Sequence, residues 1–247
     1  MILLNRIIIS FCLLTGLFLD LSAQETSGSQ EAQYTEIYRQ TEALVGVNPL
    51  LRNGVYYEDF YFNAEGHPFF TDEGYLAGSV TYRGQSYEDV KLRYDIFSHQ
   101  LLILHDDGKE IFENYLSVEF ITEFTIAGAR FKKLLAGDEQ EGFYQLVAGD
   151  ERLLCCYHWI KSRSEDHEGN YMKYVFGEQR ARRYLLMEGE LKRYRNNRSF
   201  LKALPDGVRS STRSYLRDHK LKVKKADDGR MQELLSFITG RLTQDPQ

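Results

Sequence analysis

A two-residue alternation of apolar and polar side chains dominates the centre of this chain, over residues 55–203. Val90, Leu92 and Tyr94 alternate with charged residues, and the apolar side chains of 118–126 follow the same period. In an extended chain, a period of two places successive side chains on opposite faces. One face is then apolar and the other polar, which is typical of an antiparallel sheet with one solvated side.

Turn signals divide this region at short intervals. Gly, Asn and Asp tolerate the backbone conformations that tight hairpins need, and the prolines lie outside the expected strands. The turn signals are at 83–85, 106–108, 127–128, 149–150, 169–170 and 188–189. We therefore predict a mainly β fold, an antiparallel β-meander of roughly eight to ten strands, arranged as a sandwich or an open barrel.

Helical spacing of apolar residues appears on both sides of the β region. In 31–45 this spacing predicts a short N-terminal helix. Beyond residue 205, two segments each gather their apolar residues on one face and begin near an Asp that can cap a helix. We predict a C-terminal helix pair over about 206–242. A basic connector, Lys220–Lys225, joins its helices, and the pair buries its apolar faces on the sheet.

The first 23 residues have the three parts of a secretory signal peptide. Arg6 supplies a positive charge, Ile7–Leu19 is largely apolar, and Ala23 precedes the expected cleavage point. The apolar run is too short for a comfortable transmembrane helix. We therefore expect an exported protein, in the periplasm or on the outer-membrane or extracellular side, with no transmembrane anchor after cleavage. The predicted divisions are a signal peptide (1–23), a disordered leader (24–30) and a single β-rich domain with C-terminal helices (31–247).

Composition excludes several classes of protein, and the charge is unevenly distributed. A hydrophobic content of 43% and a mean hydropathy of −0.45 exclude a disordered chain and a multi-span membrane protein. Residues 24–150 carry 9 Lys+Arg and 22 Asp+Glu, a net charge of −13, whereas 151–225 carry 19 and 9, a net charge of +10. Either the two halves attract each other within one fold, or the basic half binds an anionic partner.

The segment 180–198 concentrates basic and aromatic residues in the basic half. A turn at Glu188-Gly189 would fold it into a hairpin with both residue types alternating on a ribbon. Such a ribbon suits anionic polysaccharide, lipid headgroups or nucleic acid, and the export signal argues against nucleic acid. The alternative is a solvated face that balances the acidic half. The candidate residues are Arg180, Arg182, Arg183, Tyr184, Lys192, Arg193, Tyr194, Arg195 and Arg198.

Two adjacent cysteines, Cys155 and Cys156, follow the predicted signal peptide. A disulfide between neighbours closes no stabilising loop and is strained, so the two form a candidate redox pair. The alternative is a pair of small apolar residues on opposite faces of one strand.

Motifs for catalysis are missing from the sequence. It contains no His-Glu-x-x-His, no nucleophile elbow and no phosphate-binding Gly loop. We therefore expect no metal and no cofactor, and we incline towards a non-enzymatic role. Paired carboxylates for glycoside hydrolysis stay open, because the sequence does not show which acidic residues face each other.

Several short sequence segments resemble segments of secreted and cell-envelope proteins of the Bacteroidota. They are Ser22-Ala23-Gln24, the segments 84–87 and 90–95, and the segment 142–147 ahead of a hairpin. The resemblance implies export to the envelope, and it implies no activity and no site residues.

These observations favour an exported cell-envelope protein that acts as a non-enzymatic binding or scaffold module. Its expected partner is an envelope protein, a lipid or an anionic glycan, and not nucleic acid. Two alternatives remain: a structural component of a surface or secretion complex, and a secreted glycan-acting hydrolase with paired carboxylates.

Overall fold

The computed structural model describes residues 49–52, 54–106, 108–134, 141–168 and 171–243. The chain divides into two compact units, 1–52 and 53–247. In the first unit the structure describes only the short helix α3 (Pro49–Arg52). The predicted signal peptide, leader and helix at 31–45 lie outside the described residues.

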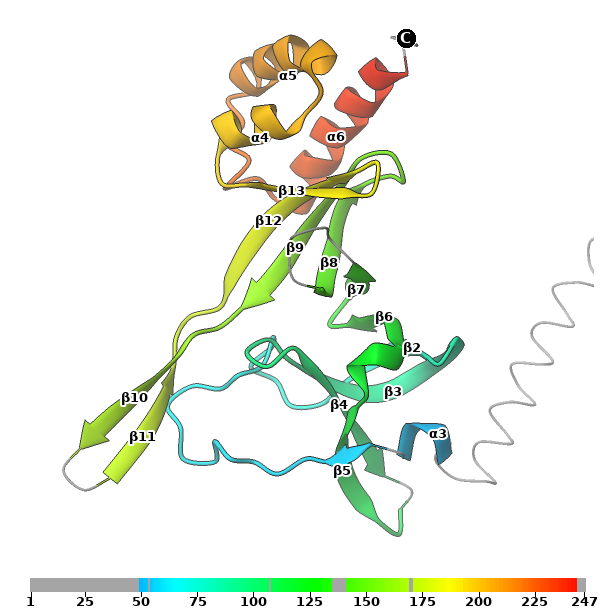
Figure 1. The fold of residues 1–247 in the computed structure, drawn as a ribbon, viewed down its shortest axis with the longest axis vertical. Helices are drawn as coiled ribbons and strands as arrows, with labels where there is room; N and C mark the ends of the chain where they lie inside the picture. Colours follow the sequence, from blue (N-terminus) through cyan, green and yellow to red (C-terminus); the bar gives the residue numbers. More distant parts are fainter. Residues whose placement is uncertain (1–48, 53, 107, 135–140, 169–170, 244–247) are drawn as a thin grey trace, which may run out of the picture. The chain divides into compact units, whose positions relative to one another are not determined.

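The second unit confirms the prediction of a mainly antiparallel β fold (Figure 1). Eleven of the described strands form one sheet in the order β1-β5-β4-β3-β2-β6-β7-β8-β9-β12-β13, and β10 pairs with β11. The strands are β1 (Val55–Tyr56), β2 (Leu76–Tyr82), β3 (Gln85–Asp95), β4 (Gln100–Asp106), β5 (Ile111–Leu116), β6 (Ile121–Ile126), β7 (Ala129–Leu134), β8 (Gly142–Gly149), β9 (Leu154–Ile160), β10 (Arg163–Glu168), β11 (Tyr171–Phe176), β12 (Arg180–Met187) and β13 (Glu190–Tyr194). The helices are the 3-10 helix η1 (Val118–Phe120), α4 (Asn197–Ala203), α5 (Asp206–Asp218) and α6 (Asp228–Leu242).

The short connection from β5 to β6 requires the sheet to curl. β6 pairs with β2, so that β4, β3 and β2 lie between β5 and β6 in the sheet order. Four strand spacings in a flat sheet span about 19 Å, yet only Ser117–Phe120 join the two strands, and η1 shortens them further. The sheet is therefore a single open, curled layer rather than two stacked layers.

Ring contacts across the sheet confirm the curl. Tyr94 on β3 lies 5.0 Å from Phe124 on β6, 5.2 Å from Phe131 on β7 and 6.0 Å from Phe143 on β8, measured between ring centroids. All four rings are buried. Since β3 and β8 are four strands apart in the sheet order, their side chains meet only across a concave face. This aromatic cluster fills the curled half of the sheet.

The predicted turns at 83–84, 127–128 and 188–189 join consecutive strands, whereas the turn between β3 and β4 was not predicted. Glu188 and Gly189 join β12 to β13, and both have positive φ angles, 53° and 78°. Positive φ at both central residues is the type I′ geometry that matches strand twist. The turns at 83–84 and 127–128 share this feature.

Two local predictions are wrong. The alternation at 118–126 predicted strand throughout, but Val118–Phe120 form η1, because the chain must turn there to reach β2. The β region was also expected to continue to residue 203, but Asn197–Ala203 form α4. A capping box starts α4: Asn196 Oδ1 accepts from Ser199 N at 3.0 Å, and Ser199 Oγ accepts from Asn196 N at 3.0 Å.

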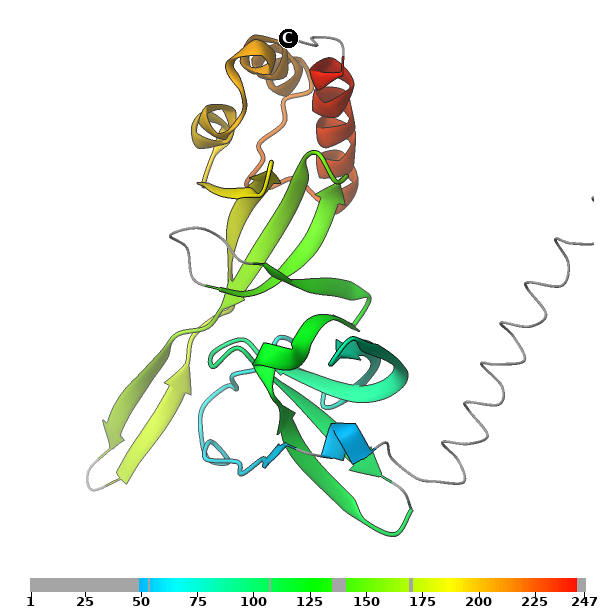
Figure 2. The ribbon, with the colours of Figure 1, turned by 45° about the vertical axis from the view of Figure 1, so that its right-hand side comes forward.

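The predicted C-terminal helix pair is present as α5 and α6, and it packs on the sheet. Figure 2 shows the three helices α4–α6 gathered at one end of β8, β9, β12 and β13. Their apolar side chains form one core with that face of the sheet. We call α4–α6 and the segments that join them the helical end.

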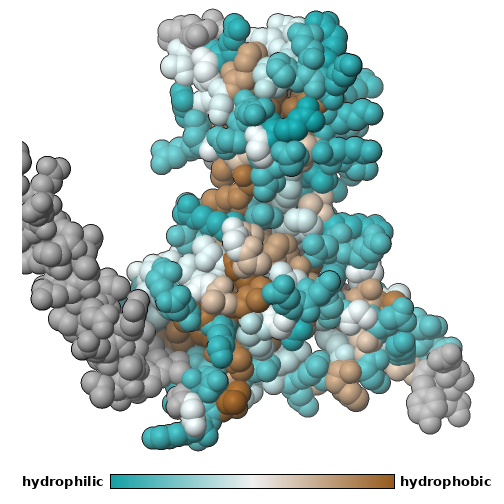
Figure 3. Space-filling model, turned by 180° about the vertical axis from the view of Figure 1, so that it is seen from behind, coloured by the Kyte–Doolittle hydropathy of each residue, from teal (hydrophilic) through white to brown (hydrophobic). Residues whose placement is uncertain are grey.

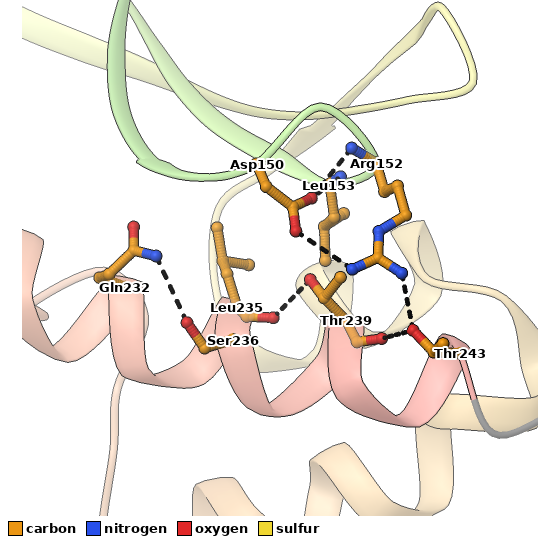
Figure 4. Close-up of polar contacts among 8 residues, drawn as sticks. All are labelled: Asp150, Arg152, Leu153, Gln232, Leu235, Ser236, Thr239 and Thr243. Atoms are coloured by element: carbon orange, nitrogen blue, oxygen red, sulfur yellow. Dashed lines mark hydrogen bonds and ion pairs between the residues drawn. The ribbon is translucent and has the colours of Figure 1, made fainter. Parts of the chain in front are cut away.

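The helix α6 is fixed to the β8–β9 turn by both apolar and polar contacts (Figure 4). Met231, Leu235 and Ile238 are fully buried. The Gly149 N–H donates to Gln232 Oε1 at 2.7 Å, and Arg152 Nη1 donates to Thr243 Oγ1 at 2.6 Å. A polar contact at each end of the helix fixes its position along the turn.

This packing predicts a large loss of stability for Leu235→Asp. The substitution places an unpaired carboxylate in the core and removes a buried leucine, so we expect the free energy of unfolding to fall by at least about 3 kcal/mol. Ser236→Asp places the same side chain at the next, exposed position of α6 and is the control. Thermal and urea unfolding of the two variants should differ clearly, and equal transitions would mean that α6 does not dock.

Candidate functional site

The predicted basic hairpin forms, but its tyrosines do not lie on the surface. β12 and β13 pair with Arg183 opposite Tyr194 and Tyr184 opposite Arg193. Both tyrosines are only 1% exposed. Tyr194 packs against Phe200 in the core below the helices, while Tyr184 packs on the other face of the sheet. The two tyrosines therefore cannot contact a ligand on the surface, because each is packed in a core, while anion binding by the exposed basic residues stays a prediction.

The candidate basic residues also divide between different surfaces. Arg183 is half-buried, with its guanidinium 5.1 Å from the Tyr157 ring centroid. The strand pleat places Arg180 and Arg182 on the opposite face of β12. Arg195 follows β13, and Arg198 lies in α4. The exposed members are Arg180, Arg182, Lys192, Arg193, Arg195 and Arg198.

The basic connector between α5 and α6 has an ordered, alternating structure. Leu221 and Val223 are buried, whereas Lys220, Lys222 and Lys224 are exposed. The side chain of Asn197, in the first turn of α4, holds this segment: its Nδ2 donates to Leu221 O at 2.7 Å and its Oδ1 accepts from Val223 N at 2.9 Å. The two apolar anchors and the amide contacts therefore turn the lysines towards solvent.

Residues flanking Asn197 place further cations beside the connector. Arg195 and Arg198 are exposed, and Arg230 Nη2 ties the start of α6 to His219 O at 3.0 Å. Hydrophilic side chains dominate the visible face of the helical end in Figure 3 (top). We define the connector surface as Arg195, Arg198, Lys220, Lys222, Lys224 and Lys225.

The cations of the connector surface are not neutralised by direct ion pairs. None of its six side chains forms an ion pair with a described residue; the nearest such pairs along the chain are Lys192–Glu190 and Arg217–Asp218. Unpaired like charges on neighbouring segments raise the local positive potential, which an anion relieves. The arrangement can therefore bind an anionic group without rearranging its backbone.

The two cysteines lie on opposite faces of β9, as the second interpretation of the pair predicted. Cys155 belongs to the core below the helices, with its Sγ 3.1 Å from Tyr194 Oη. Cys156 packs with Tyr144 and Tyr184 on the other face. Both are free thiols. Burial raises the pKa of Cys155 to about 11 and also raises the pKa of Cys156.

We expect both thiols to be unreactive in the folded protein, because the thiolate is the nucleophile and burial disfavours it. An aromatic disulfide reagent at about pH 8 should titrate no thiol of Cys155 or Cys156 on the timescale of minutes, and both after unfolding in urea. Rapid reaction of either thiol in the native state would contradict the buried environment.

Sequence reasoning missed a cluster formed by His99, His158 and Arg182. The His99 ring, in the β3–β4 turn, lies 4.7 Å from the His158 ring on β9, between centroids. Arg182 is the partner of His158 in the β9–β12 ladder. Burial lowers the pKa of His99, and the Arg182 guanidinium lowers it further. No sequence motif marks this cluster, because its three residues come from segments that are far apart in the chain.

The lowered pKa of His99 predicts a stability that decreases in acid. In the unfolded chain a histidine takes up its proton near pH 6.5, whereas folded His99 takes it up at a lower pH. Stability is therefore lost as the pH falls below about 6.5. Urea unfolding at about pH 7.5 and about pH 5.5 should show a smaller pH effect in His99→Gln. His219→Gln, which removes an exposed histidine, is the control and should behave as the wild type.

Further tests for recognisable sites give the following result. Among the residues that the structure describes, no three His, Cys, Asp or Glu side chains are placed to hold a metal ion. None of the helices within the described ranges is both long enough and apolar enough to cross a bilayer. Comparison with family models, with curated proteins and with solved structures finds no match to this chain. The geometry of the connector surface is therefore the feature from which a function can be inferred.

Proposed function

We propose that this protein is an exported binding module of the cell envelope that holds an anionic glycan on its connector surface. The observation that carries the proposal is the set of six exposed, unpaired cations around the Asn197 contacts. The proposed location is supported by the signal-peptide pattern of residues 1–23. An acidic polymer provides regularly spaced anions that can contact several of these side chains at once.

A glycan fits this surface better than a lipid bilayer. Interfacial membrane binding combines basic residues with an apolar face that enters the lipid. The large apolar side chains that are exposed in the described structure lie at Leu50, Val55, Tyr56, Phe60, Phe62, Ile111, Phe120 and Met172. All of them are outside 195–243, so the connector surface offers charge without an apolar anchor. Nucleic acid has the same charge, and the predicted export argues against it.

Charge reversal on the connector surface tests the proposal. Wild-type protein should bind heparin or polygalacturonate at low salt, and about 0.5 M salt should weaken binding because these exposed charges are screened. The triple variant Arg195→Glu/Lys222→Glu/Lys224→Glu should raise the Kd at least about tenfold, as measured by calorimetry. The change affects exposed side chains only, so the melting temperature should move little.

The control is Lys91→Glu/Arg130→Glu/Lys132→Glu, which makes the same change of net charge at exposed positions on β3 and β7 and also breaks the surface ion pairs of Lys91 with Asp106 and Arg130 with Glu123. If the control loses affinity equally, binding reflects total charge and no particular surface. If wild-type protein binds neither glycan, the proposal is wrong. Tighter binding to phosphatidylglycerol vesicles than to either glycan would assign the surface to lipid.

A further inference from the structure

A second candidate site lies far along the chain from the connector surface, where three segments meet at the base of the β10–β11 ribbon. The β9–β12 ladder ends at the pair Ile160 and Arg180, and pairing resumes at Arg163 and Phe176 in β10 and β11. Between the two ladders, residues 161–162 lie opposite residues 177–179, so one strand has an extra residue. An open depression of about 750 Å³ lies at this junction.

The loop 64–72 closes one side of the depression and is held there by backbone contacts. Glu65 N donates to Tyr174 O, and Phe176 N donates to Glu65 O, both at 2.8 Å. Gly66 then adopts a φ of +73°, and a Cβ at this position would lie 3.2 Å from Phe176 O. The loop next pairs with the end of β3 through Phe69 and Asp95. The wall is therefore fixed before any ligand arrives.

Polar side chains in the depression are held in a defined arrangement. His67 Nδ1 accepts from Phe69 N at 3.1 Å, which leaves Nε2 protonated to donate to Asp72 Oδ1 at 2.7 Å. Lys161 Nζ donates to His67 O at 2.8 Å. Gln179 supplies an amide from the third segment. Carboxylate, ammonium and amide groups therefore border one space and provide both acceptors and donors.

Aromatic rings provide the apolar part of the lining. Phe70 is held edge-on against Phe131 and Trp159, with ring centroids 5.2 Å and 5.5 Å away. Phe176 is held by Tyr61 and Phe97 at 5.0 Å and 5.6 Å. Rings that are locked in this way lose little entropy when a ligand packs on them.

The lining points to a neutral ligand with many hydroxyl groups. Lys161 carries one positive charge, while Asp72 and Glu178 carry two negative charges, so the lining neither concentrates positive charge for an anion nor excludes polar groups. A sugar ring has hydroxyls that both donate and accept, and an apolar C–H face that packs on aromatic rings. The volume lies within the range of about 300–1,000 Å³ that small-molecule sites occupy.

We propose that this depression binds a neutral oligosaccharide, with Asp72, Lys161 and Gln179 contacting hydroxyl groups and Phe70 contacting a sugar face. This site is separate from the connector surface and does not depend on the function proposed for it. Trp159 is the single tryptophan of the chain and its ring contacts Phe70. Trp159 lies behind the lining, so its fluorescence reports on binding in the depression through its contact with Phe70.

The experiment is a fluorescence titration of the purified chain with maltotriose, cellotriose and xylotriose, each to about 10 mM. At least one should change the Trp159 signal saturably. Asp72→Asn and Gln179→Ala should each weaken that binding about tenfold, the usual result of losing a hydrogen bond to a charged or buried polar group. Both positions are exposed, so the variants should fold.

Glu73→Gln is the matched control, because it removes a carboxylate one residue from Asp72 and outside the lining. Equal effects of Asp72→Asn and Glu73→Gln would overturn the proposal. So would the lack of a saturable signal with all three sugars, or a signal with trigalacturonate alone, which would make the depression an anion site. The connector triple variant should bind the neutral sugar like wild-type protein, which separates this result from the first proposal.

Discussion

The four residues that connect β5 to β6 impose the curvature on which the rest of the structure depends. They are too few to cross a flat sheet, so β2–β6 must curl until β6 can pair with β2. The curl produces a concave face, and Tyr94, Phe124, Phe131 and Phe143 fill it. A β-bulge at Asp89, with φ of 54°, adjusts the phase of β3 so that both Tyr87 and Leu92 are buried.

The packing on both faces of this part of the sheet also explains why the tyrosines of the basic hairpin are buried. In β8, β9, β12 and β13, one face carries the helices and the other continues towards the curled half. Cys155 and Cys156 show this division at adjacent positions, since each is buried in a different core. Where a face of the hairpin is covered, as at Arg183, a long basic side chain keeps mainly its charged end in water. Exposed cations remain on the hairpin strands, and Arg195 and Arg198 continue them where the chain leaves the sheet beyond Tyr194.

Much of the fold could be predicted from local sequence signals, because period two, period 3.6 and turn residues each report on short-range structure. The short helix α4 could also have been found, since Asn196 and Ser199 have capping-box spacing. The position of β6 beside β2 could not, because it depends on pairing between distant strands. The same reason hides the candidate sites: Asn197 contacts Leu221 and Val223, and Lys161 contacts His67. Composition predicted a basic surface, but only these long-range contacts locate it.

The distribution of ion pairs among the described residues bears on the two interpretations of the uneven charge. If the acidic and basic halves existed mainly to attract each other, ion pairs would join them. Within the described ranges, Glu65–Lys173 joins them at 3.1 Å, and Asp150–Arg152 is a contact within one turn. The cations of the connector surface take no part in such pairs. Direct ion pairs with the described part of the acidic half therefore do not account for the charge of this surface, and the proposed anion binding starts from that observation.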